Sequence, residues 1–248
     1  MAKQDKKQDM GSGSIPSLML NLAIPAVVAQ LINMLYNIVD RIYIGHIPDA
    51  GASALTGVGL FLPILMMINA FAMLAGSGGA PRAAIAMGKG DREGAQKIMG
   101  NCFSVLMIFA VLLTVLFYAF APQLLRLFGA SDVTLPYALS YARIYIVGIV
   151  FVMIVMGLNP FITTQGFAKF SMLTTVMGAV CNIILDPILI FGFGMGVQGA
   201  ALATVISQAV SAVWVLGFLR GGRTMLRLTV ADMKLIPEVI APCLALGI

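Results

Sequence analysis

The chain has 248 residues, of which 60% are apolar and only 10% are charged, with a net charge of +5 and a mean hydropathy of +1.00. Water-soluble domains carry about 25% charged and about 45 to 50% apolar residues, so this chain lacks the polar groups to cover its own surface in water. The composition excludes disordered, collagen-like, coiled-coil and nucleic-acid-binding chains, which need charge or periodic polarity. It predicts a membrane protein.

Apolar stretches of about 20 residues, the length that crosses a bilayer as a helix, mark six predicted spans. They are Ser17 to Ile44, Ala52 to Gly76, Ile98 to Phe120, Leu135 to Pro160, Phe170 to Gly192 and Val197 to Leu219. The glycine-rich stretch 76–79 is predicted to be a turn and a close-packing point. The predicted fold class is an all-α membrane protein, with a six-helix transmembrane bundle over residues 15–219 after a polar tail at 1–14.

The basic residues predict the orientation of this bundle. Twelve of the fifteen Lys and Arg residues lie in the tail or in the segments after the second, fourth and sixth spans, and only Arg41, Arg126 and Arg143 fall on the other side. Cytoplasmic loops carry the excess of positive charge, so the N-terminus and the segment 220–234 are predicted to be cytoplasmic.

A further apolar run, 235–248, is too short to span a bilayer by itself. Its opening resembles that of the first span, with Pro242 in the place of Pro25. We expect this run to be the truncated start of a seventh helix in a longer protein, with residues 220–234 as a cytoplasmic linker between two lobes. Parallel-repeat transporters are built in this way.

Polar side chains inside the spans mark a candidate site, because an ionisable group deep in a bilayer costs about 2.5 to 3.5 kcal/mol. Asp186 is the clearest case, and Asn182 lies four residues earlier on the same helix face. Ser171, Thr175 and Gly178 share that face.

Two other spans have polar faces. These faces comprise Gln30, Asn33, Tyr36, Asn37 and Asp40 in the first span, and Thr204, Ser207, Gln208 and Ser211 in the sixth. Lipid cannot satisfy such groups, so three polar faces predict a wet or ion-holding interior. Plainer interpretations stay open. Either acid could lie at the membrane interface, where Asp40 would pair with Arg41. The neutral polar side chains could form ordinary hydrogen bonds between helices.

Three stretches together resemble the multidrug and toxic compound extrusion (MATE) transporter family. They are Asn37 to Gly45, Ala86 to Asn101 and Asn182 to Gly192. The resemblance implies a transporter, not an enzyme, with twelve helices in two lobes in the inner membrane of a bacterium. This chain would be the N-terminal lobe, and the C-terminal lobe of the same chain and the lipid bilayer would be its partners, with no nucleic acid.

The resemblance also implies site residues. A cation or proton site, with Na⁺ as a possible ligand, would comprise Asp40, Asn182, Asp186 and Thr204; the substrate cavity would include Asn33, Tyr36, Asn37, Tyr141 and Asn159. Pro25, which removes a helical hydrogen-bond donor, would be the conformational hinge. No cofactor is expected apart from the coupling ion, H⁺ or Na⁺.

The mechanism expected from these residues is secondary active antiport by alternating access. Entry of H⁺ or Na⁺ would neutralise Asp40 and Asp186, rearrange the first helix near Pro25 and expel an amphipathic, cationic drug. Three alternatives are a lipid-linked sugar flippase of a sibling family, an ion channel and an intramembrane aspartyl protease. Neither membrane acid, Asp40 or Asp186, lies in the Gly-x-Gly-Asp signature of such proteases.

Overall fold

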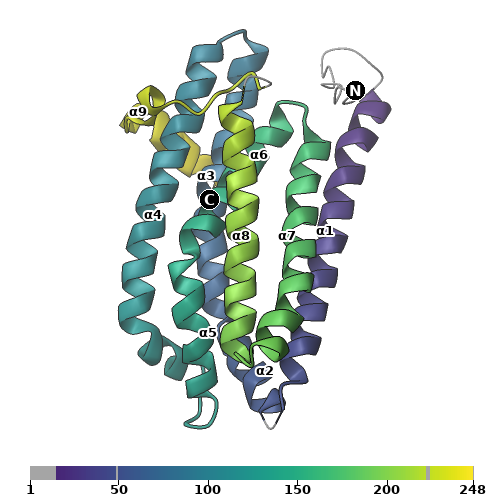
Figure 1. Ribbon diagram of the computed structural model, residues 1–248. Coiled ribbons are helices and arrows are strands. Elements are labelled where there is room, and N and C mark those ends of the chain that lie inside the picture. The colour runs from purple at the N-terminus through teal and green to yellow at the C-terminus, as the bar shows by residue number, and fades with distance from the viewer. Residues whose placement is uncertain (1–14, 49, 222–223, 248) are drawn as a thin grey trace.

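The computed structural model describes residues 15–48, 50–221 and 224–247, and these ranges form a helical bundle without a β-strand (Figure 1). The α-helices are α1 (Ile15–Gly45), α2 (Gly51–Leu60), α3 (Leu62–Gly88), α4 (Arg92–Leu127), α5 (Leu135–Val147), α6 (Ile149–Thr164), α7 (Ala168–Pro187), α8 (Val197–Arg220) and α9 (Pro237–Gly247). A π-helical turn, Ile188–Gly192, follows α7, and a 3-10 turn, Val230–Met233, precedes α9. The predicted tail at 1–14 lies outside the described residues.

The helices give the predicted number of spans. In the described part of the chain, five helical segments are long and apolar enough to cross a membrane, with α2 and α3 together forming one of them. Helices α5 and α6 meet at a bend of 57° and make a sixth span if they are counted together. The prediction of an all-α, six-helix membrane bundle is therefore confirmed.

The predicted turn at residues 76–79 is wrong, because α3 continues through these glycines to Gly88. The glycines are instead points of close backbone packing. A Cβ atom on Gly76 would lie 3.1 Å from the Met156 carbonyl oxygen, and one on Gly78 would collide with the Cys243 carbonyl oxygen. The real turn is at 89–91, where the Asp91 side chain accepts a hydrogen bond from the Gly94 amide (2.8 Å) and caps α4.

The fourth predicted span is bent, not straight. The bend is at Gly148, where α5 gives way to α6 and approaches α8 closely. A Cβ atom on Gly148 would lie 2.5 Å from a Val205 methyl group, so only glycine lets the two helices come this near.

The core lies among α3, α4, α5, α6 and α8. Phe61, at the junction of α2 and α3, contacts the rings of Tyr141 and Tyr145 edge-on, with centroids 5.5 and 5.1 Å apart. Helix α8 runs through the middle of the view, whereas α1 lies at one edge against α7 (Figure 1). The outward face of α1 exposes large apolar side chains: Met19, Leu20, Ile24, Val27, Leu31, Met34, Leu35, Ile38 and Ile42.

The ends of the bundle separate the connections into two groups. The start of α1, the α3–α4 turn, the α6–α7 turn and the segment after α8 lie at one end (Figure 1). The helix arrangement brings most of the described Lys and Arg residues to this end: Arg82, Lys89, Arg92, Lys97, Lys169, Arg220, Arg227 and Lys234.

Candidate functional site

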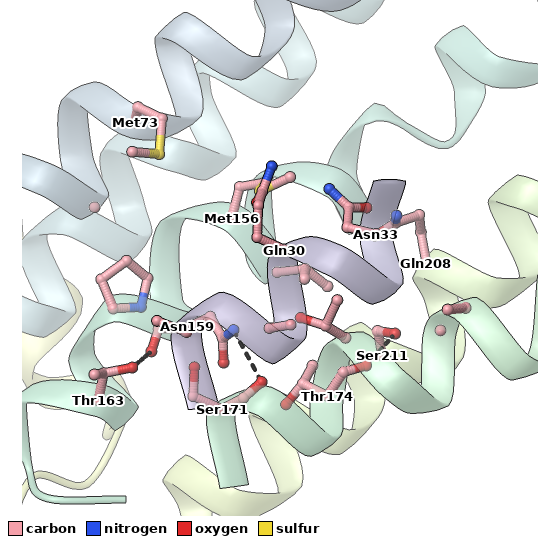
Figure 2. Close-up of a pocket in the computed structure, with 18 of the residues that line it drawn as sticks. Gln30, Asn33, Met73, Met156, Asn159, Thr163, Ser171, Thr174, Gln208 and Ser211 are labelled. Carbon is pink, nitrogen blue, oxygen red and sulfur yellow. Dashed lines mark hydrogen bonds between the residues drawn. The ribbon is translucent and has the colours of Figure 1, made fainter. Parts of the chain in front are cut away.

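A cavity of about 490 Å³ opens between α1, α3, α6, α7 and α8. Its walls are neutral as far as the described residues form them, because these supply amide, hydroxyl and apolar side chains but no Lys, Arg, His, Asp or Glu. Figure 2 shows Gln30 and Asn33 on α1, Asn159 and Thr163 on α6, and Gln208 on α8 around this space.

The polar faces predicted from the sequence converge on the cavity. Its lining includes most of the polar residues predicted from helix periodicity: Gln30, Asn33, Tyr36, Ser171, Thr175, Gly178, Ser207, Gln208 and Ser211. Asn159, expected from the resemblance, also lines it and donates a hydrogen bond to the Ser171 carbonyl oxygen (3.3 Å), which joins α6 to α7. The helices thus turn their polar groups toward a shared space.

The two acids form a separate cluster outside the cavity lining. Asp186 on α7 is fully buried and Asp40 on α1 is 9% exposed, and the two carboxyl groups are near enough to interact electrostatically. Two ionised carboxylates this close repel each other strongly, so the pair favours a shared proton or a bound cation.

Asn182 and Thr204 connect the acid pair to the cavity. The Asn182 amide nitrogen donates to an Asp186 carboxylate oxygen (3.3 Å) and to the Thr204 hydroxyl oxygen (3.4 Å). Both residues also line the cavity. A change of charge at Asp186 can therefore reach the cavity wall through one amide.

The cluster offers oxygen atoms to a small cation. One oxygen each of Asp40, Asn182 and Asp186 is buried and accepts no hydrogen bond from the described residues. Buried polar atoms are normally paired, so three unpaired oxygens in one cluster indicate a place for a proton or a hard cation. Among the described residues no group of three or more His, Cys, Asp and Glu side chains forms a metal site, so a cation here would depend on the amide and hydroxyl oxygens as well.

Besides the two acids, three predicted site residues lie away from the cavity wall. Tyr141 is buried and stacks on Tyr145, with ring centroids 5.8 Å apart. The exposed Asn37 side chain bonds back to the Asn33 carbonyl oxygen (2.6 Å). Pro25 is buried inside α1, which is continuous through it.

Some cavity residues were missed in the sequence. Thr163 and Thr164 on α6, Ser77 on α3 and Thr174 on α7 line the space as well. Asn159 and Thr163 are four residues apart, and this spacing on one helix face was the signal that could have identified Thr163.

Comparison with known proteins identifies the family. The MatE family model matches residues 25–188. The multidrug export protein MepA of Staphylococcus haemolyticus is 29% identical over 213 residues, which are 86% of this chain and 47% of that protein. The FAD transporter of Shewanella oneidensis is 26% identical over 204 residues, which are 81% of this chain and 44% of that protein. The chain spans about half the length of these relatives.

Solved structures share the fold. A crystal structure of MATE in complex with MaD3S is 30% identical, with a TM-score of 0.87, and the match covers 95% of this chain and 52% of that one. A MOP superfamily transporter from Pyrococcus furiosus, whose binding pocket is described as reversed in polarity, is 30% identical with a TM-score of 0.88, and the match covers 98% and 54% of the two chains.

These relatives are transporters or exporters, which agrees with the prediction of a multi-pass membrane transporter and not an enzyme. The family match covers more than half of the chain, and the fold matches over nearly all of it. The chain therefore belongs to the MATE family, as the three stretches quoted from its sequence predicted.

Proposed function

We propose that this chain is the N-terminal lobe of a secondary active multidrug exporter, in which inward movement of H⁺ or Na⁺ drives efflux. The observation that carries the proposal is the buried pair of carboxyl groups, Asp40 and Asp186, on two different helices beside a neutral cavity. A site that binds a cation between α1 and α7 changes the attraction between these helices when the cation arrives or leaves.

The coupling route is short. Cation binding would remove the repulsion between Asp40 and Asp186 and draw α1 toward α7. Asn182, which contacts Asp186 and lines the cavity, would pass the change to the substrate space. Pro25 lies in α1, where a missing backbone donor makes bending easier. Similar MATE proteins have been solved in a straight and in a bent conformation, and as a proline-to-alanine mutant.

The driving force is adequate for export. One elementary charge crossing 100 mV releases about 2.3 kcal/mol, which corresponds to roughly a 40-fold concentration ratio. One ion per cycle is therefore enough to keep an uncharged drug well below its external concentration inside the cell. Exchange of one ion for one monovalent cationic drug moves no net charge, so there the concentration gradient of the ion has to drive export.

The cavity favours amphipathic substrates over lipid-linked sugars. A lipid diphosphate would need Lys or Arg to pair with its phosphates, and none of the described residues that line the cavity is a Lys or Arg. Apolar walls with a few amides and hydroxyls suit drug-sized molecules. The MepA relatives, named multidrug export proteins, support this choice of substrate class.

The same proposal places the protein in the membrane. The basic end of the bundle, which includes the start of α1 and the segment after α8, would face the cytoplasm of a bacterial inner membrane. The second lobe, needed to close the substrate path, would follow α9.

The test uses full-length protein reconstituted in vesicles, with Na⁺ and pH gradients imposed separately and efflux of a cationic dye measured. We expect one gradient to drive efflux, and Asp186→Asn to lose at least 90% of it. Asp132→Asn, in an exposed loop where the acid pairs with Arg126, is the matched control. Unchanged gradient-driven efflux in Asp186→Asn would remove the acid pair from the mechanism, and ion flux far faster than dye flux would favour a channel.

A further inference from the structure

The segment after α8 is held against α4 by hydrogen bonds from α4 side chains. Arg92 Nε donates to the Met225 carbonyl oxygen (2.7 Å), and Ser104 Oγ donates to the Met233 carbonyl oxygen (2.6 Å). Gln96 adds a longer bond to the Arg227 carbonyl oxygen (3.4 Å). We call residues 224–236 the connecting segment.

Asn101 is the centre of this contact. Its side chain is buried, with the residue 1% exposed, and its Oδ1 accepts a hydrogen bond from the Ile236 amide (2.7 Å), directly before α9 begins at Pro237. Its Nδ2 donates to the Lys97 carbonyl oxygen (2.8 Å) and to the Asp232 carbonyl oxygen (3.4 Å). One amide therefore joins its own helix, the 3-10 turn and the start of α9.

The backbones also fit closely at this point. A Cβ atom on Gly100 would collide with the Asp232 carbonyl oxygen, so the 3-10 turn lies directly on the α4 backbone. Thr229 Oγ1 donates to the Asp232 side chain and closes the turn from within. The turn has little freedom to move while Gly100 and Asn101 keep their places.

The first half of the connecting segment is anchored by alternate side chains. Leu226 and Leu228 are buried, whereas Met225, which precedes them, and Arg227, which lies between them, are exposed. The Leu226 amide donates to Gln165 Oε1 (2.9 Å), and the Leu228 amide donates to the Leu219 carbonyl oxygen (3.0 Å). This alternation is typical of an extended chain with one face on the protein.

The contacting residues of α4 recur at the spacing of one helix face. Arg92, Gln96, Gly100 and Ser104 are four residues apart, and Asn101 lies beside Gly100. The groups that they bind on the connecting segment are all backbone groups. This surface thus recognises the path of the backbone and not particular side chains.

Helix α9, which the connecting segment leads into, packs on the cavity-forming helix α3. A Cβ atom on Gly78 would collide with the Cys243 carbonyl oxygen, and one on Gly247 would collide with the Leu74 carbonyl oxygen. The neighbouring Met73 and Ser77 of α3 line the cavity. The position at which α9 begins therefore determines how α9 packs against the outer side of α3, the helix that forms one cavity wall.

We propose that the α4 face formed by Arg92, Gln96, Gly100, Asn101 and Ser104 is a docking surface for the connecting segment, and that Asn101 is a positioning residue for α9. The connecting segment is then a rigid strut that carries movements of the α4 end directly to α9. This gives a role to the stretch Ala86 to Asn101, which neither the cavity nor the acid pair uses.

The experiment is hydrogen–deuterium exchange of the full-length protein in lipid nanodiscs, measured on peptides covering 224–236. In the unmodified protein we expect these amides to exchange far more slowly than in an unstructured chain. Asn101→Leu removes both hydrogen bonds between Asn101 and the connecting segment, so it should speed exchange there by about tenfold or more. Glu93→Ala changes an exposed residue in the first turn of α4 and should leave exchange unchanged.

A second variant distinguishes a local loss of docking from a general folding defect. Gly100→Ala keeps Asn101 but adds the Cβ atom that meets Asp232, so it should speed exchange in 224–236 while peptides of α7 and α8 keep their protection. Fast exchange in the unmodified protein, or no change in both variants, would overturn the proposal. The readout needs no transport, so the outcome is independent of the proposed export function.

Discussion

Helices α1 and α8 both contribute to the cavity, yet they are held in opposite ways. Along α1, Pro25, Asp40 and Ile44 are the only buried residues among those whose side chains the structure describes. Along α8, one whole face of small and apolar residues is buried: Val197, Gly199, Ala200, Ala201, Ala203, Thr204, Ser207, Ser211, Ala212, Val215 and Leu219.

The difference separates a fixed wall of the site from a wall that can move. Helix α8 packs through backbone contacts that tolerate no added atom, so Thr204 has a fixed position. Helix α1 lies at the edge of the bundle, and two of its three buried residues are the proposed hinge and the proposed ion ligand. Regions with few buried apolar contacts open most easily, so we expect the lobe to change shape by movement of α1.

The largest effect should come from disturbing the fixed wall. In Gly199→Leu the new side chain would meet the Leu189 carbonyl carbon and oxygen at 2.7 and 2.8 Å, so backbone must shift. We expect a loss of about 1 to 3 kcal/mol of stability, or misfolding, in thermal unfolding of the full-length protein. Gly217→Leu, on the same helix with nothing within 4 Å, is the control, and equal stability of the two variants would contradict the fixed-wall interpretation.

Removing the charge on the movable wall should abolish coupling without unfolding the protein. In Asp40→Asn, the repulsion between Asp40 and Asp186 is lost, so thermal stability should stay equal or rise. Gradient-driven dye efflux should fall by at least tenfold. Asp40→Glu keeps a carboxyl group and should retain part of the activity. Normal efflux in Asp40→Asn would mean that α1 contributes no ion ligand.

Replacing the proposed hinge should have a smaller effect. Proline inside a helix costs about 3 kcal/mol, so Pro25→Ala should stabilise a straight α1 and slow transport several-fold. Spin-label distances between α1 and α8 would show whether α1 samples fewer positions. Pro122→Ala, inside α4 and outside the cavity lining, tests the removal of a helix proline elsewhere. A hinge at Pro25 would be refuted by equal distance distributions in the Pro25 variant and the unmodified protein.

The smallest effect should come from the outward face of α1. Met34 is 61% exposed in the lobe, so Met34→Ala should change the stability of the isolated lobe by less than about 0.5 kcal/mol. Repeating the measurement in the full-length protein sharpens the comparison. A loss above 1 kcal/mol there would show that another part of the chain covers this face.

Hydropathy predicted the spans well because lipid demands apolar surface over a fixed length. It could not predict where helices end outside the bilayer. The α3 helix continues through the polar residues around Arg82, and α4 begins six residues before Ile98, since a helix needs only its own backbone bonds to continue there. The bend at Gly148 and the docking of the connecting segment depend on contacts between distant residues, which no local pattern contains.

The site was predicted in part. Asp186 and Asn182 could be paired from their spacing, because a single helix fixes their relation. That the acids form a cluster outside the cavity could not be foreseen, since it depends on how α1 and α7 are rotated about their axes. For the same reason Asn37 was expected in the cavity, although it bonds to its own helix instead.

If the proposed export function holds, the neutral lining of the cavity has a consequence for drug resistance. A pocket that binds its substrate through many weak dipolar contacts, without an ion pair, loses little binding free energy when a substrate lacks one of these contacts. Chemically unrelated compounds of similar bulk would then be tolerated almost equally, and point changes in the wall would shift the exported spectrum gradually. A drug would then avoid export through changes in its size or hydrophobicity more than through changes in its functional groups.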